Sequence, residues 1–234
     1  MTMVWILFLL LPLAWLVYAL LPTVYYKYLR DNSLRAMGLQ GEKQLLLSFD
    51  DGPDETYTPQ LLDLLAAEDV KAVFFILAEK AKRYPELLAR LREEGHMVAL
   101  HGKTHKNMWL CDYLDTQENL VDGAKIWTAL GGGGAYYRPP HGNINLFTLH
   151  FLKKCGLKLV FWTVMAQDWR ADTTSFEIYR KLCARTKDGA IICLHDAGED
   201  TGGAPGAPAR TIDALKEFLP RQKSLGYRFV LPPQ

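Results

Sequence analysis

The chain has 234 residues, 49% of them hydrophobic, and a formal net charge of +1 at pH 7. This length and composition suit one globular domain with one core and a short appendage, so we expect a single active site. The basic residues are scattered, which argues against nucleic acid as the main partner. The four cysteines show neither CxxC metal spacing nor a dense disulfide pattern, and we expect Cys193 to lie in a buried strand.

An apolar run opens the chain, because residues 1–26 contain no Asp, Glu, Lys or Arg. At about 1.5 Å per residue, the stretch from Met3 to Pro22 is long enough to cross the roughly 30 Å hydrocarbon layer of a bilayer. It lacks the basic start and the small-residue cleavage site of a signal peptide. We therefore expect a transmembrane anchor over residues 1–26 and a juxtamembrane linker over residues 27–43. A buried core helix is the alternative.

Apolar runs and helix-period segments alternate through the rest of the chain, residues 44–234. The predicted strands are 45–49, 72–76, 97–100, 135–137, 158–164, 190–194 and 228–230, and the predicted helices are 59–67, 85–94, 115–130, 145–154, 173–185 and 211–219. Such alternation is typical of βα units around a parallel sheet, so the fold class is α/β. About seven strands suit an irregular βα barrel better than an eight-fold one.

Two adjacent carboxylates, Asp50 and Asp51, follow the first predicted strand directly before Gly52-Pro53. Adjacent carboxylates repel each other strongly unless a cation or a proton-transfer role separates them. One carboxylate as metal ligand and the other as base resolves this conflict. The alternative is an ordinary turn with two solvated acids.

Two histidines, His101 and His105, are four residues apart directly after the third predicted strand. In a helical turn this spacing places both imidazoles on one face, with about 6 Å between their Cβ atoms. A carboxylate from a neighbouring strand end would complete a set of two histidines and one carboxylate that leaves positions open for water and substrate. The alternative is one surface histidine and one core histidine.

Three further polar residues follow predicted strands: Arg138, Asp168 and His195. Histidine titrates near neutral pH, so His195 is a natural general acid, although a lone histidine at a strand end is commonly scaffolding. The convergence of acids, histidines and an arginine at strand ends favours catalysis, because barrel folds place their active sites at the carboxyl ends of the strands.

Five motifs occur in order: Ser-Phe-Asp50-Asp51-Gly-Pro, His101-x-x-x-His105, Arg138-Pro-Pro-x-Gly, Asp168-Trp169 and Leu194-His195. Together they resemble the polysaccharide deacetylases of the NodB-homology type (carbohydrate esterase 4) over residues 44–231. The resemblance implies a distorted (β/α)7 barrel. It also implies metal-dependent removal of N-acetyl groups from amino sugars in a cell-wall or related surface polysaccharide, peptidoglycan-like or chitooligosaccharide-like.

The resemblance further implies a role for each motif residue. Catalytic roles fall to Asp50 (general base), His195 (general acid), Arg138 (holding Asp50) and Asp168 (orienting His195); metal binding to Asp51, His101 and His105; and substrate binding to Pro140, His141, Trp169 and Leu194. The ion would be divalent, usually zinc, with cobalt as another candidate. The backbone N–H after Pro140 would help to stabilise the oxyanion.

The chain departs from the family pattern at four positions: Gly102, Lys106, His141 and Met165. The family usually has Ser or Thr at the first, Pro at the second, Tyr at the third and an acid at the fourth. No ligand, base or acid is lost, so we expect the chemistry to survive and the hydrogen-bond network or the choice of substrate to change. Two alternatives stay open: a glycan-binding pseudoenzyme, and a related metal hydrolase of a small amide or an acetyl ester.

The flanking charges and the expected substrate favour opposite membrane orientations. Lys27, Arg30 and Arg35 follow the apolar run, which by the positive-inside rule favours a cytoplasmic domain. Glycan polymers lie outside the cell, which favours the outer face. We expect a single-pass, monomeric membrane protein with an extracellular catalytic domain.

Overall fold

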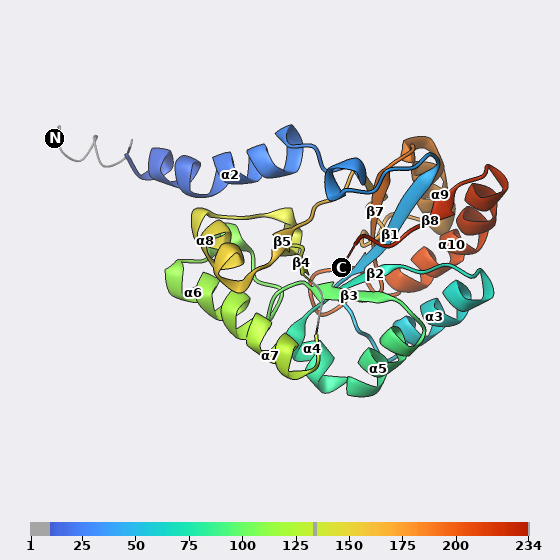
Figure 1. Ribbon diagram of the computed structural model, residues 1–234, viewed down its shortest axis with the longest axis horizontal. Coiled ribbons are helices and arrows are strands. Elements are labelled where there is room, and N and C mark those ends of the chain that lie inside the picture. The colour runs from blue at the N-terminus through green and yellow to red at the C-terminus, as the bar shows by residue number, and fades with distance from the viewer. Residues whose placement is uncertain (1–9, 133–134, 234) are drawn as a thin grey trace.

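The computed structural model describes residues 10–132 and 135–233 (Figure 1). Its parallel strands are β1 (Gln44–Asp50), β2 (Val73–Ile76), β3 (Met97–Leu100), β4 (Tyr136–Tyr137), β5 (Lys158–Leu159), β6 (Val164–Met165), β7 (Ala190–His195) and β8 (Arg228–Phe229). They pair in the order β5-β4-β3-β2-β1-β7-β6, and β8 pairs with the start of β1. The predicted α/β class and the parallel sheet are confirmed.

Helices cover the outside of this sheet (Figure 1). They are α3 (Tyr57–Ala67), α4 (Ala78–Arg83), α5 (Pro85–Glu93), α6 (Tyr113–Gln117), η5 (Glu118–Asp122), α7 (Gly123–Ala129), α8 (Leu146–Cys155), α9 (Ser175–Arg185) and α10 (Ala207–Ser224). Three short 3-10 turns are η3 (Arg35–Met37), η4 (Met108–Leu110) and η6 (Pro140–Gly142). Helix α4 was not predicted from the sequence. The predicted start of α10 was four residues late because Pro208 resembled loop sequence, whereas proline is well tolerated in the first turn of a helix.

An apolar helix, Leu10–Leu29, precedes the sheet and extends beyond it in Figure 1. It contains η1 (Leu16–Leu20), α2 (Leu21–Val24) and η2 (Tyr25–Leu29). The predicted run from Met3 to Pro22 begins outside the described residues. The following segment contacts the domain, because Leu34 is buried and its N–H donates to the carbonyl of Gly189 over 3.0 Å.

The prediction of one continuous strand over residues 158–164 is wrong. The segment forms β5 at one end of the strand order and β6 at the other. Between them, the N–H of Val160 donates to Tyr137 over 2.9 Å and the N–H of Thr163 donates to Ile191 over 2.9 Å. The chain therefore passes from the β4 side to the β7 side within a few residues and joins the two ends of the sheet into a distorted barrel.

Residues of alternate parity in the strands face two different cores, as the two-residue period of a strand requires. Leu45, Leu47 and Phe49 of β1 pack in the cluster that the helices cover. Leu46 packs with Val73 and other side chains of the same parity in a second cluster inside the barrel. A residue two positions after an inward-facing residue is therefore also directed into the barrel.

A buried histidine, His96, supports a stability prediction. Its Nδ1 accepts a hydrogen bond from the N–H of Ala72 over 3.2 Å, and its ring packs edge-on against Phe74. Burial, with the positive charge of Lys71, lowers the pKa of His96 to about 4. The unfolded chain then binds one more proton than the folded chain between about pH 6.5 and about pH 4. The contribution of His96 to the free energy of unfolding is fully present above this window and is lost as the pH falls through it.

We therefore expect the protein to lose roughly 3 kcal/mol of stability through His96 as the pH falls from about 7 to about 4. A loss of this size lowers the Tm by roughly 6–12 °C for a chain of this length. Thermal unfolding of the detergent-solubilised chain should show this shift, and His96→Asn, which keeps an acceptor but does not titrate, should show a smaller one. Equal pH dependence in both proteins would contradict the assignment.

Candidate active site

Strand parity brings the predicted catalytic residues together at the carboxyl ends of the strands. Asp50 of β1 is two positions after Ser48 and faces the same interior as the inward residues of its neighbours. His195 is its direct partner in the β1–β7 register. His101 follows β3, and Arg138 follows β4 with no exposed surface. The predicted convergence of these side chains is therefore present.

Asp51, His101 and His105 form a compact group of potential metal ligands, with one atom of each within 4.8 Å of the others. Both histidine Nε2 atoms lie 3.2 Å from Asp51 Oδ1. This oxygen is buried and accepts no hydrogen bond from the described residues. The Nδ1–H of His101 donates to the carbonyl of Arg138 over 2.8 Å, so the lone pair of its Nε2 faces the carboxylate. A cation between these atoms removes the repulsion, and the donor set fits a divalent metal.

The expectation that His101 and His105 lie on one helical turn is wrong, because residues 101–107 form a non-helical loop. Their ring centroids nevertheless lie 5.5 Å apart. Gly102 turns the chain with a φ of 105°, and Asn119 holds the loop: its side chain accepts from the N–H of Lys103 (3.0 Å) and donates to the carbonyl of Thr104 (2.9 Å). Hydrogen bonds from the Asn119 side chain to the loop therefore bring the two imidazoles together without a helical turn.

Asp51 has its backbone in the left-handed region, with a φ of 76°. This conformation is uncommon for a residue other than glycine and is found at functional sites. The hydroxyl of Thr201 donates to Asp51 Oδ2 over 2.8 Å. Thr201 thus orients the carboxylate so that Oδ1 faces the histidines.

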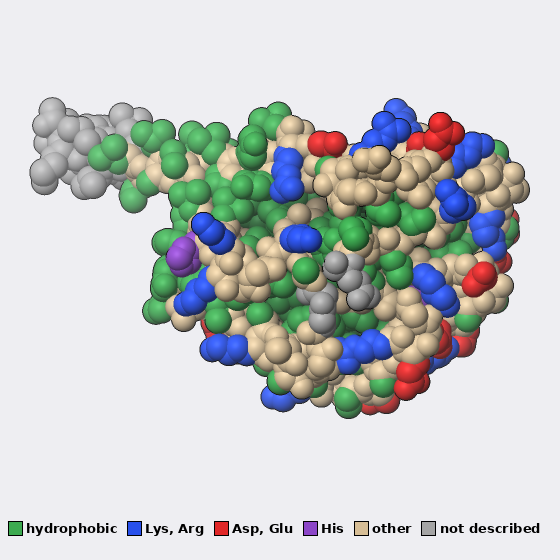
Figure 2. All heavy atoms as spheres, viewed as in Figure 1, with side chains coloured by type: hydrophobic (Ala, Val, Ile, Leu, Met, Phe, Trp, Pro, Cys, Tyr) green, Lys and Arg blue, Asp and Glu red, His purple; other side chains and the backbone are tan. Residues whose placement is uncertain are grey.

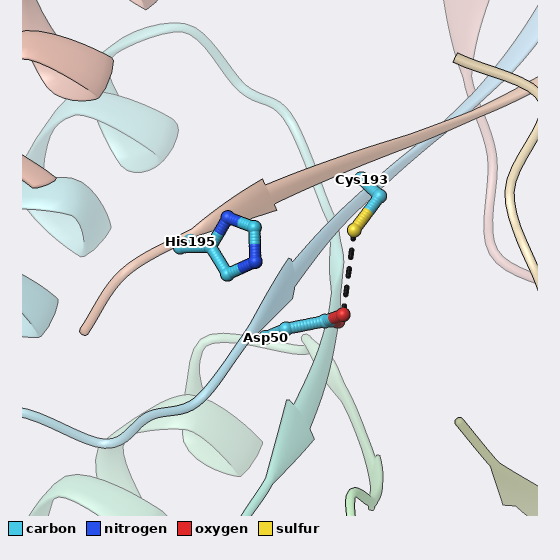
Figure 3. Close-up of side chains that lie close together, drawn as sticks. All are labelled: Asp50, Cys193 and His195. Atoms are coloured by element: carbon cyan, nitrogen blue, oxygen red, sulfur yellow. Dashed lines mark hydrogen bonds between the residues drawn. The ribbon is translucent and has the colours of Figure 1, made fainter. Parts of the chain in front are cut away.

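Asp50 is held by Arg138, which follows β4, and by Cys193 on the neighbouring strand β7. Arg138 Nη1 donates to its Oδ1 over 2.7 Å and to the hydroxyl of Ser48 over 2.8 Å. Cys193 Sγ donates to its Oδ2 over 3.3 Å, and Figure 3 shows this contact beside His195. Burial and the nearby Asp50 raise the pKa of the Cys193 thiol well above its usual range, so it remains a protonated donor. Ligand atoms of Asp50, Cys193 and His195 also lie within 4.8 Å of one another, but a protonated thiol is a poor metal ligand because metals bind the thiolate.

His195 is paired with a buried carboxylate. Its Nδ1–H donates to Asp168 Oδ1 over 3.0 Å, and its backbone N–H donates to Oδ2 over 2.8 Å. The hydroxyl of Thr211 also donates to Oδ2. Burial lowers the pKa of His195, but Asp168, with Asp51 and Asp50 nearby, outweighs it and raises the pKa to about 10. His195 is therefore an imidazolium at neutral pH and carries a proton that it can donate.

One cavity of about 360 Å³ is lined by Asp50, Asp51, His101, His105 and His195. Its wall also includes Trp169, His141 and Met165, so the position of the usual family acid carries a side chain that faces the substrate space. Pro139 contributes to the wall, whereas Pro140 and Leu194 do not, and Leu194 is fully buried against the helices. Their roles in substrate binding remain predictions.

Several residues that hold the site side chains or the histidine loop in place were not predicted from the sequence: Ser48, Cys193, Thr201, Asn119 and Thr211. Strand parity offered a signal for Ser48 and Cys193, which are two residues before Asp50 and His195. No local pattern indicated the others, because Thr201 and Thr211 are far along the chain from the groups that they bind. Tertiary structure alone brings them into the site.

Comparisons with known proteins agree with this geometry. The family model described as polysaccharide deacetylase matches residues 38–160. The chain is 34% identical to a peptidoglycan-N-acetylglucosamine deacetylase of Bacillus cereus over 81% of the chain and 86% of that protein. It is 30% identical to a chitooligosaccharide deacetylase of Rhizobium leguminosarum bv. trifolii over 82% of the chain and 92% of that protein.

Solved structures with the same fold include a peptidoglycan N-acetylglucosamine deacetylase bound to a hydroxamate-type benzamide. It superposes with a TM-score of 0.73 and 29% identity, covering 81% of this chain and 86% of the other. A family 4 carbohydrate esterase from Streptomyces lividans in complex with acetate superposes with a TM-score of 0.71 and 26% identity, covering 81% and 92%. The chain therefore belongs to the polysaccharide deacetylase family, the NodB-homology enzymes of carbohydrate esterase family 4.

Proposed function

We propose that the protein removes N-acetyl groups from amino sugars of a cell-wall or related surface polysaccharide by metal-dependent hydrolysis. The observation that carries this proposal is the presence, in one cavity, of a buried carboxylate beside an arginine, a separate set of metal ligands and a protonated histidine. The names of the relatives support peptidoglycan-like and chitooligosaccharide-like glycans as substrates.

The residues divide the work of amide hydrolysis among them. Asp51, His101 and His105 would hold a divalent ion, which we propose to be zinc; when bound, it would polarise the acetamide carbonyl and lower the pKa of water toward about 7. Asp50, fixed by Arg138, takes the proton of the attacking water. The backbone N–H of His141 stabilises the developing oxyanion. His195 donates its proton to the departing amine, so the products are acetate and a free amino sugar.

The paired carboxylate of His195 supports a pH prediction. Because His195 must be protonated to act, activity falls as the pH rises through its pKa, which Asp168 raises. Asp168→Asn removes that charge, so the alkaline limb of the kcat profile should move to lower pH by at least about one unit. Measuring acetate release against pH checks this. If the alkaline limb is unchanged in Asp168→Asn, His195 is not the general acid.

A panel of substrates tests the reaction class. The metal-loaded full chain should release acetate from chitotetraose and from peptidoglycan, with a new amine for each acetate. Release of acetate from acetyl esters but from neither glycan would favour the related ester hydrolase. Saturable glycan binding with no release would favour the pseudoenzyme.

We propose that the apolar run, whose described part is the helix Leu10–Leu29, anchors the chain in a membrane as a single span through its amino-terminal part, while the turns from Tyr18 onward pack on the domain. It is long and apolar enough to cross a bilayer, and Leu11 and Leu21 of this helix are half exposed or more. Leu110 and Leu114 on the adjoining domain surface are 82% and 70% exposed, and Figure 2 shows hydrophobic side chains over the helix and the neighbouring part of the domain. A bilayer would cover both.

We further propose that the domain acts as a monomer on the outer face, where glycan polymers lie, although Lys27 and the basic residues after it favour the inner face. Protease treatment of intact cells distinguishes the two orientations. An external domain is digested in intact cells, whereas an internal one is digested only after lysis.

A further inference from the structure

The apolar helix delivers one cationic side chain, Lys27, into the wall of the catalytic cavity. Lys27 lies on η2, about one turn beyond Thr23, which packs on the domain. It lines the same cavity as Asp50, His101 and His195. A residue at the start of the predicted linker, residues 27–43, therefore forms part of the wall of the substrate cavity.

The position of this helix is fixed by contacts of a buried threonine. The hydroxyl of Thr23 donates to the carbonyl of Ile144 over 2.9 Å and accepts from the N–H of Ile144 over 3.0 Å. It also accepts from Trp109 Nε1 over 2.8 Å. One turn earlier, the hydroxyl of Tyr18 donates to the carbonyl of Cys111. These contacts hold the helix against the loops beside the cavity, so Lys27 has a defined place.

The ammonium of Lys27 lies against groups of the cavity wall. Nζ donates to the carbonyl of His141 over 3.3 Å and lies 4.9 Å from the ring centroid of Trp162. Gly142 permits this approach, because a Cβ there would lie only 2.7 Å from Nζ. Lysine over an aromatic face is a stabilised arrangement. The half-buried side chain is thus directed toward the cavity.

No carboxylate neutralises this ammonium within the part of the chain that the structure describes. None lies within 4.0 Å of Nζ, whereas the fully buried Arg138 is paired with Asp50. A partly buried cation without a counter-ion is stabilised when an anion binds next to it.

We infer that Lys27 binds an acidic substituent, a carboxylate or a phosphate, on the N-acetylated glycan whose acetamide lies at the metal-ligand set. This inference rests on the proposed function and narrows its substrate class to anionic glycans. The enzyme then prefers a glycan with an acidic group near the reacting acetamide over a neutral one. Lys27 is a specificity-determining residue supplied by the helix, so the catalytic domain without that helix lacks part of its substrate site.

Lys27→Met in the full, detergent-solubilised chain tests this inference. The probes are neutral chitotetraose, a disaccharide of N-acetylglucosamine and N-acetylmuramic acid for the carboxylate, and N-acetylglucosamine 1-phosphate for the phosphate. We expect the ratio of kcat/KM for an acidic probe to that for chitotetraose to fall by about 10- to 100-fold. Lys27→Arg should keep most of the preference, and Lys82→Met, an exposed lysine on α4, should keep all of it.

Binding provides a readout that does not depend on turnover. In an Asp50→Asn background, quenching of tryptophan fluorescence by each probe measures affinity with and without Lys27→Met. Selective weakening of one acidic probe supports the inference and identifies the acid. Equal affinity changes for neutral and acidic probes, in protein with an unchanged Tm, overturn it. Failure of the wild type to release acetate from any probe defeats the proposed function, while the binding result still decides the role of Lys27.

Discussion

Asp50→Asn is expected to lower kcat for acetate release by about 100- to 10,000-fold and to leave metal content unchanged. Asparagine has nearly the same shape, and its amide oxygen can still accept from Arg138 Nη1, which lies 2.7 Å from Asp50 Oδ1. It cannot take a proton from water. Asp50 is also outside the set of Asp51, His101 and His105, so the ion should remain bound.

Two measurements on this variant separate chemistry from folding. The substitution leaves the fully buried Arg138 without its charged partner, so the Tm should fall, and activity must be compared well below that Tm. Asp213→Asn, at an exposed ion pair with Lys216, is the matched control and should change neither property. Loss of metal in Asp50→Asn, or retention of more than about a tenth of the activity, would contradict its role as base.

His101→Ala and His105→Ala are each expected to remove bound zinc and at least about 1,000-fold of the activity. Each substitution deletes one of three donors that meet within 4.8 Å, and two donors hold a divalent ion far more weakly than three. Zinc content after dialysis of the loaded full chain measures this directly. The wild type should retain about one ion and each variant less than about a tenth.

The same experiment distinguishes between two candidate groups of metal ligands. Asp50, Cys193 and His195 also approach one another closely, and a metal held there would depend on the thiol. Cys193→Ser should keep its zinc if the ion belongs to the histidine set, and so should His150→Ala, an exposed histidine on α8. Zinc retained in His105→Ala but lost in Cys193→Ser would move the ion to the other group.

Much of the site follows from strand periodicity, which the sequence displays. Asp50, His101 and His195 each end or follow an apolar run, and the two-residue period directs them into the barrel together with Arg138. Parallel strands place their carboxyl ends at one rim, so residues far apart in sequence meet. The convergence could be predicted because it depends on local pattern and on a general property of βα folds.

The remaining features depend on tertiary contacts that no local pattern encodes. The run Val160-Phe161-Trp162 has strong strand preference throughout, yet it crosses between β4 and β7 because the barrel has to close there. The approach of His101 and His105 depends on a loop that Asn119 supports. These contacts form only when distant segments fold against one another.

The departures from the family pattern have specific structural settings. At Gly102, a Cβ would overlap Asn119 Oδ1, so the glycine and the asparagine that supports the loop occur together. Lys106 pairs with Asp115 over 2.8 Å on the surface. Met165 contributes its side chain to the cavity wall, and its carbonyl accepts from Arg185 over 2.6 Å. These changes modify the surroundings of the reacting groups and keep the groups themselves.

Acetate release by the zinc-loaded full chain measures metal-dependent deacetylation itself. Incubation with chitotetraose and with peptidoglycan should yield acetate and an equal amount of new primary amine. Removal of the metal by a chelator should stop the release, and added zinc should restore it. Acetate release that is unaffected by chelation, or no release from either glycan while zinc is bound, would contradict the account.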